Sequence, residues 1–190
     1  MKRLKLLFAL FLVSSAAKTT AQITVEPVFP TPTDAVTVTF NAAEGNAGLA
    51  SETGDEYAHT GVITNLSTSP SDWKYVKAGW TTNVPECKLT RVNATTYTLT
   101  IPNIRTFYGV PAAENILKLA FVFRNATGTV TGKTADNGDI FYDVYSAGSA
   151  LRTRIVSPTQ TCSAVSSGTQ LAFRGAASVA ANLTLTDNGT

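Results

Sequence analysis

Hydrophobic and polar residues alternate with a period of two along much of this chain. Apolar side chains recur at Val36, Val38 and Phe40 with threonines between them, and the same pattern spans residues 97–101 and 140–144. In a strand, such alternation places one set of side chains on a core face and the other set on the outside. The pattern therefore predicts an all-β, antiparallel fold.

The longest alternating run covers residues 117–124, and Leu117, Leu119, Phe121 and Phe123 would share its core face. Clusters of turn-forming residues separate the alternating runs, at 30–34, 44–46, 125–128 and 136–138. Short strands at this spacing are typical of an Ig-like β-sandwich. The one helical pattern that we find is a single turn at 111–115, with proline at its start.

The strand pattern changes after Tyr145. We expect one β-sandwich over residues 22–145, a linker at 146–150 and the opening strands of a second Ig-like sandwich in 151–190. The strands of this second unit are expected at 151–156, 169–174 and 181–186. Three strands cannot cover their own apolar face, so the pattern indicates a truncated second domain in a fragment of a longer chain. The alternative is that these strands complete one larger domain.

The first 21 residues have the organisation of a secretory signal peptide. Lys2, Arg3 and Lys5 precede an unbroken apolar run at 6–13, and small residues follow up to Ala21. The run is shorter than the roughly 20 residues of a membrane-spanning helix. We predict cleavage after Ala21 and a secreted, extracellular or cell-surface location, with no membrane insertion of the mature protein.

Removal of this segment also changes the charge balance. The whole chain has a net charge of +2, but the mature part keeps eleven basic and thirteen acidic residues, a net charge of −2. A slightly acidic protein has no electrostatic reason to bind nucleic acid, so we expect no nucleic-acid partner.

Groups for catalysis or metal binding are sparse. His59 is the single histidine, and Asp55 and Glu56 are sequence neighbours that a strand would send to opposite faces, which makes a poor acid–base pair. Cys87 and Cys162 form no CxxC motif, and their pairing stays open. We expect no enzymatic activity, no metal site and no cofactor.

One acidic cluster has two interpretations. Residues 136–139 read Asp-Asn-Gly-Asp, whose oxygen atoms could hold calcium. A hairpin turn is the favoured interpretation, because a calcium loop needs more carboxylates at fixed offsets.

Aromatic residues gather in one polar stretch. Tyr57 and His59 lie two apart in a strand-like run and would share a face, while Ala58, Thr60 and Val62 take the other face. The two tryptophans, Trp73 and Trp80, lie within the polar sequence that follows. Exposed rings beside hydrogen-bonding groups suit a sugar, because the ring packs against the C–H face of a pyranose. The alternative is that one tryptophan belongs to the sandwich core.

These residues also carry a family resemblance. The runs Gly54–Thr64, Trp73–Val76 and Lys88–Arg91, together with Trp80, resemble the N-terminal module of secreted α-amylase-family glycoside hydrolases from Bacteroidetes-like bacteria. The segments 97–101, 105–110, 117–125 and 138–144 continue the likeness. The pattern is more distantly similar to the starch-binding modules of families twenty-five and twenty-six.

The resemblance implies a monomeric, non-catalytic β-sandwich that binds starch or another α-glucan for a larger hydrolase. It implies a sugar platform of Tyr57, His59 and a tryptophan, Trp73 or Trp80. We expect Asp55 and Lys74 at the rim of that platform. A competing hypothesis is a structural or adhesion-type Ig-like segment of a secreted or cell-surface protein, which the Thr/Ser/Ala-rich tail after Ser146 favours.

Overall fold

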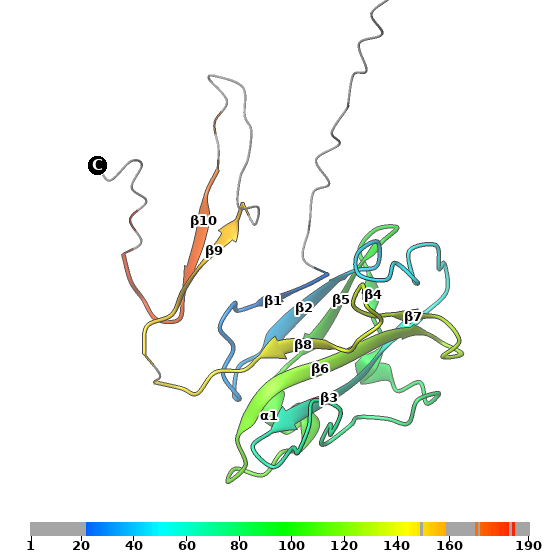
Figure 1. Ribbon diagram of the computed structural model, residues 1–190, viewed down its shortest axis with the longest axis horizontal. Coiled ribbons are helices and arrows are strands. Elements are labelled where there is room, and N and C mark those ends of the chain that lie inside the picture. Colours follow the sequence, from blue (N-terminus) through cyan, green and yellow to red (C-terminus); the bar gives the residue numbers. More distant parts are fainter. Residues whose placement is uncertain (1–21, 149, 159–169, 171, 183, 185–190) are drawn as a thin grey trace, which may run out of the picture.

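The computed structural model of the chain describes residues 22–148, 150–158, 170, 172–182 and 184 (Figure 1). They form a mostly β protein with antiparallel sheets of four, four and two strands and one short α-helix. This confirms the predicted all-β class. The expected signal peptide at 1–21 lies outside the described residues. Within the described residues, no helix has the length and apolar character needed to cross a membrane.

The first sheet has the strand order β1-β2-β5-β4. Its strands are β1 (Ile23–Glu26), β2 (Val36–Asn41), β5 (Thr96–Ile101) and β4 (Thr90–Arg91). Buried and more exposed residues alternate along β2 and β5, as the sequence predicts.

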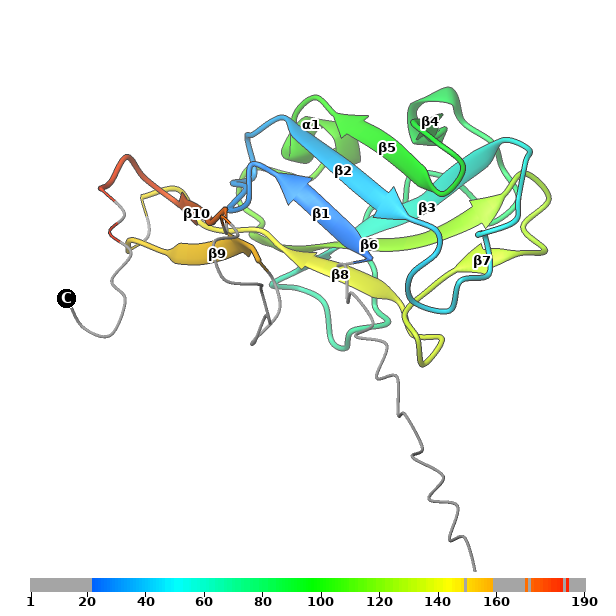
Figure 2. The ribbon, with the colours of Figure 1, turned by 90° about the horizontal axis from the view of Figure 1, so that it is seen from above.

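The second sheet is built around the long strand β6, which pairs with β3 on one side and with β7 and β8 on the other. The bounds are β3 (Glu56–Thr64), β6 (Ile116–Asn125), β7 (Thr131–Gly132) and β8 (Ile140–Asp143). Figure 2 shows this sheet beneath the first one.

Strands β7 and β8 follow the same edge of β6, one after the other. Gly132 of β7 pairs with Phe123 of β6, and Ile140 of β8 pairs with Phe121, only two positions away on β6. The seven residues between them, 133–139, therefore loop out from the edge of the sheet. A turn is present near the expected position, since the Asn137 N–H donates to the Thr134 carbonyl at 2.9 Å. The expected hairpin at 136–139 is nevertheless wrong, because β7 and β8 run in the same direction and do not pair with each other. The turn is the tip of an excursion, which we call the β7–β8 loop (133–139).

Side chains from both four-stranded sheets form one hydrophobic core. Phe40 of β2 stacks on Phe123 of β6 with ring centroids 4.0 Å apart, and Phe123 in turn stacks on Phe121. Val38, Leu99 and Leu119 are at most 3% exposed. Burial of this apolar surface is the main source of stability for such a fold.

Strand β6 is buried on both faces along its second half, which the alternation does not predict. Ala120, Val122 and Arg124 face away from the core but are at most 3% exposed. Leu117, expected on the core face, is 45% exposed near the start of the strand. The outer face of the sheet is therefore covered near its centre by chain from the loops.

The predicted helical turn at 111–115 is wrong. The α-helix α1 is Ile104–Tyr108. Residues 111–114 form a turn that is closed by a hydrogen bond from the Glu114 N–H to the Pro111 carbonyl. The Asn103 side chain caps the N-terminus of α1, and Gly109 ends it with φ = 74°. Both capping residues are visible in the sequence, but the helix is too short to show an apolar period.

The third sheet is a hairpin of β9 (Thr153–Ser157) and β10 (Arg174–Ala177). β9 falls within the expected strand 151–156 to within one residue. The strand expected at 169–174 is displaced, because 170, 172 and 173 lie outside any strand. Of the strand expected at 181–186, the described residues 181, 182 and 184 are not in a strand, and the rest lie outside the described residues.

Candidate functional site

The floor of the candidate site is the outer face of β3 and β6. His59 on β3 lies directly opposite Val122 on β6 in the antiparallel register. His59 is half-buried, while its neighbours Ala58 and Thr60 are 3% and 1% exposed and point into the protein. The period of two in β3 thus puts the histidine ring on the face away from the core.

The segment after β3 folds back along this strand and forms one side of the site. Lys74 and Val62 exchange two backbone hydrogen bonds of 2.8 and 2.9 Å, and the Lys77 N–H donates to the Thr60 carbonyl at 3.0 Å. Gly61 permits this close approach, because a Cβ there would lie 3.0 Å from the Lys74 carbonyl oxygen. The segment places Trp73 beside His59.

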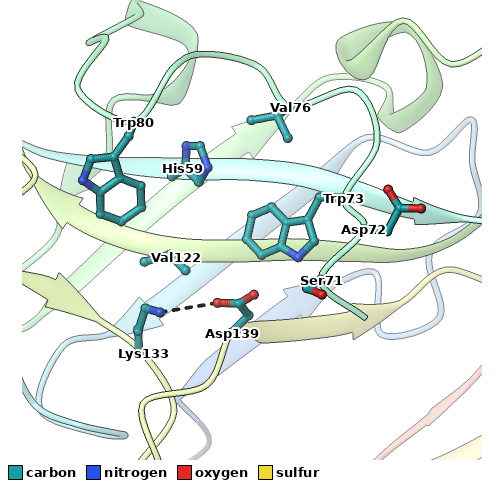
Figure 3. A pocket seen from close by; sticks show the side chains of 9 residues that line it. All are labelled: His59, Ser71, Asp72, Trp73, Val76, Trp80, Val122, Lys133 and Asp139. Carbon is teal, nitrogen blue, oxygen red and sulfur yellow. Dashed lines mark ion pairs between the residues drawn. The ribbon is translucent and has the colours of Figure 1, made fainter. Parts of the chain in front are cut away.

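Three aromatic rings line the site in a row (Figure 3). Trp73 stacks beside His59 with centroids 5.7 Å apart and an interplanar angle of 27°. Trp80 meets His59 edge to face, at 5.0 Å and 69°. Trp73 is half-buried and Trp80 is 39% exposed. Neither tryptophan therefore belongs to the core.

Trp80 is held by the turn between β6 and β7. Its Nε1 donates to the Gly128 carbonyl at 3.2 Å. Gly128 has φ = 73°, and a Cβ at this position would lie 2.8 Å from the indole nitrogen. The Trp73 indole differs, because its Nε1 is buried and has no hydrogen-bond partner within the described residues.

Two ion pairs flank the aromatic row. Lys133 and Asp139, at the two ends of the β7–β8 loop, are 3.5 Å apart, and Lys74 lies 2.9 Å from Asp72. Hydrogen bonds from Lys74 and from the Thr68 backbone hold the pKa of Asp72 below its usual value. Rings and ion pairs together surround an open cavity of about 380 Å³.

The histidine in the middle of this cavity favours its neutral form. Partial burial lowers its pKa below 6.5, and the nearby positive charge of Arg124 lowers it further, against a smaller opposing effect of Asp139. A neutral imidazole has one donor and one acceptor nitrogen, so His59 can both give and accept a hydrogen bond.

The structure brings together three of the six residues expected at a binding surface. His59, Trp73 and Trp80 line the cavity. Lys74 does not line the cavity but is ion-paired to Asp72, which does. Tyr57 and Asp55 lie outside it: the Tyr57 ring packs against the Arg124 guanidinium at 5.4 Å, and Asp55 pairs with Lys88 at 2.8 Å.

Tyr57 shares the face of His59, as the period of two predicts, but the two residues have different surroundings. Tyr57 forms a β-bridge with Lys88, which brings the segment after η1 (Pro85–Cys87) alongside the start of β3. This extra pairing was not predictable from the sequence, since Lys88 lies 31 residues after Tyr57 in a stretch without alternation.

Six further residues line the cavity, and sequence reasoning did not select them for the sugar site: Ser71, Asp72, Val76, Val122, Lys133 and Asp139. Asp72 was detectable as the neighbour of Trp73. Val122 was detectable as the outward residue of β6. Lys133 and Asp139 were not detectable, because their approach depends on the β7–β8 loop.

No group of three or more His, Cys, Asp or Glu side chains that could hold a metal ion occurs in the described part of the chain. Asp136 instead accepts a hydrogen bond from the Thr134 hydroxyl at 2.5 Å. Cys87 is a buried thiol, and burial raises its pKa to about 11. Cys162 lies outside the described residues, so the pairing of the two cysteines stays open.

Comparison of the chain with protein-family models finds no match, and comparison with curated proteins finds none either. The functional argument therefore depends on the geometry of the site.

Proposed function

We propose that residues 22–145 form an Ig-like β-sandwich that binds carbohydrate without catalysis, with starch or a related α-glucan as its ligand. The observation that carries the proposal is the row of Trp73, His59 and Trp80 in an open cavity. Aromatic faces pack against the apolar C–H side of a pyranose, and polar groups around them bind the hydroxyls.

The angles between the rings favour a curved polysaccharide. Trp73 and His59 are 27° from parallel, but Trp80 is turned by 69° relative to His59. A flat, ribbon-like glycan needs coplanar rings, whereas successive sugars of a helical α-glucan turn relative to one another. The bend of the aromatic row supports the second type of ligand.

The charges of the site favour a neutral sugar. Asp72 and Asp139 each have a lysine partner, so the negative and positive charges beside the rings balance. Hydroxyl groups can accept from lysine and donate to carboxylate within such pairs. An acidic polysaccharide would find no unpaired cation among these cavity-lining groups.

The same ion pairs support a non-catalytic role. A glycosidase needs one carboxyl that holds a proton and one that stays ionised. Hydrogen bonding lowers the pKa of Asp72, which is the opposite of what a general acid requires. We propose that catalysis belongs to a secreted α-amylase-family hydrolase of which this module is a part, as the sequence resemblance implies.

A structural or adhesion segment is the second candidate, and the β9–β10 hairpin favours it. Leu151, Ile155, Phe173 and Val179 are 49–59% exposed. Uncovered apolar side chains of this kind are typical of surfaces that contact another domain or protein.

Single tryptophan variants test the proposal. In the mature chain, Trp80→Ala should weaken the free energy of binding to insoluble starch by roughly 2 kcal/mol or more, because aromatic anchors dominate such surfaces. Its thermal unfolding should change little, since the ring is outside the core. Trp73→Ala should also weaken binding, with a larger loss of stability because Trp73 is half-buried.

Val92→Ala provides the control, because Val92 is an exposed apolar residue beside β4 of the other sheet. This variant should bind starch as the wild type does. If the wild type has no affinity for any α-glucan, the carbohydrate-binding proposal fails and the adhesion role replaces it.

A further inference from the structure

A buried arginine lies next to the proposed binding site without lining it. Arg124, near the end of β6, is 2% exposed and faces the same side of the sheet as Val122. It takes part in none of the ion pairs found among the described residues. A buried cation without a carboxylate partner is costly, so its position needs a physical reason.

The guanidinium joins two loops. Nη2 donates to the Thr82 carbonyl at 3.0 Å, and Nη1 donates to the Asn83 side chain at 2.8 Å and to the Asn125 carbonyl at 3.0 Å. Only Nε lacks a partner within the described residues. A planar guanidinium can donate to two chain segments at once at fixed angles, which a lysine ammonium cannot reproduce.

These two loops are the ones that meet at Trp80. The segment 80–83 carries the tryptophan, and the turn 125–128 accepts its indole hydrogen bond through Gly128. Asn83 adds a second link, because its Nδ2 donates to the Ala126 carbonyl at 3.1 Å. Trp80 itself is exposed at the surface, so little core packing fixes its ring.

We infer that Arg124 is a positioning residue that holds Trp80 upright as the end wall of the sugar site. This inference builds on the proposed function, since it assigns to Trp80 a binding role. The arginine acts from beneath the two loops and does not contact the ligand. Its stacking on Tyr57 explains why that tyrosine lies beside the site and not in it.

The test replaces Arg124 by lysine and by methionine in the mature chain labelled with 5-fluorotryptophan. Two fluorine resonances are expected, and a Trp80→Phe variant assigns them. In Arg124→Lys and Arg124→Met the Trp80 resonance should shift and change width while that of Trp73 stays near its wild-type position. Starch affinity should fall by about tenfold.

Arg91→Lys is the matched control. Arg91 also donates to backbone carbonyls, at Glu52 and Gly54, and also stacks on a tyrosine, Tyr97, at 4.6 Å. It belongs to β4 in the other sheet, so its substitution should leave the Trp80 resonance and the affinity unchanged even if stability falls.

Asn83→Ala keeps the test decisive if the arginine variants do not fold. Asn83 is exposed, and its removal takes away one acceptor of the guanidinium and one link to Ala126. The Trp80 resonance should shift in the same direction as in Arg124→Lys, by a smaller amount.

The fluorine signal is read without ligand, so it separates the two claims. A shifted Trp80 resonance in the Arg124 variants, together with a wild type that binds no glucan, would overturn the proposed function and leave the positioning role intact. A folded Arg124 variant with unchanged Trp80 resonance and unchanged affinity would overturn the inference.

Discussion

The Glu56 carboxyl at the start of β3 is buried on the face of the strand opposite to that of His59. The residue is 1% exposed, and neither oxygen has a hydrogen-bond partner among the described residues. The Arg91 Nη2 lies 3.8 Å from Oε1. Burial raises the pKa of Glu56 above 4.5. This effect is larger than the lowering of the pKa by the Tyr97 hydroxyl and by the positive charge of Arg91.

This burial predicts a pH-dependent stability that Glu56→Gln removes. The folded state holds the proton to higher pH than the unfolded state, so the wild type loses stability as pH rises from 4.5 through the raised pKa. The loss cannot exceed about 1.4 kcal/mol per pH unit, the limit for one proton. Urea unfolding between pH 4 and 8 measures it.

The Glu56→Gln variant should show a flatter profile over that range. Glu86→Gln, which changes the same charge at an exposed position, should keep the wild-type profile. Parallel profiles for the wild type and Glu56→Gln would show that the buried carboxyl does not titrate as described.

At the scale of single residues, the sequence identifies the aromatic centre of the site better than its rim. His59 and the tryptophans are rare residue types that draw attention, and strand periodicity fixes the face of His59. Asp55 was expected at the rim, but it pairs with Lys88 outside the cavity. Tertiary contacts between distant segments decide such rim positions, and one sequence does not reveal them.

At the scale of elements, periodicity gives the long strands and misses the irregular pieces that shape the site. β2 and β5 were predictable, because half-buried strands alternate. The strand β6 was also expected, but not the burial of its second half on both faces. The helix α1 was displaced from the expected position, because five residues carry no period. The β7–β8 loop was unpredictable, because leaving and rejoining one strand edge depends on distant partners: the Lys133 carbonyl accepts hydrogen bonds from Gln22 and Asn46.

The close approach of the Trp73 segment to β3 predicts the effect of Gly61→Val. The new side chain would meet the Lys74 carbonyl and Val76, which lie 3.0 and 3.1 Å from a Cβ at this position. The segment should move off the strand edge and carry Trp73 away from His59. We expect about a tenfold or greater loss of starch affinity and roughly 1–3 kcal/mol of destabilisation from overpacking.

Gly54→Ala is the control for this variant, because a Cβ at Gly54 would meet nothing within 4 Å. Its affinity and unfolding midpoint should match those of the wild type. Unchanged starch binding by Gly61→Val would contradict the role of the segment in positioning Trp73.

At the scale of the whole molecule, arginines of the β9–β10 hairpin contact the four-stranded sheets and the segment after β1. Arg174 pairs with Glu26 at 3.0 Å, and Arg154 lies against the rings of Phe29 and Tyr142. Exposed pairs of this kind contribute at most about 1 kcal/mol each. The sequence suggested the change of organisation after Tyr145, since the alternating apolar pattern weakens there.

This difference in packing predicts where a protease will stop. The core of the first unit draws on both four-stranded sheets, whereas Ile155 and Phe173 of the hairpin region are 59% and 49% exposed. Segments with few buried apolar contacts open locally at low cost. Limited proteolysis of the mature chain should therefore leave a resistant fragment that ends between Ser146 and Leu151, as mass spectrometry can determine.

A recombinant chain of residues 22–145 should unfold within a few degrees of the mature protein, because the hairpin adds little to the core. Protection of the region after Leu151 equal to that of the sheets, or a large fall in the unfolding temperature of the shortened chain, would show that the hairpin is an integral part of one larger domain.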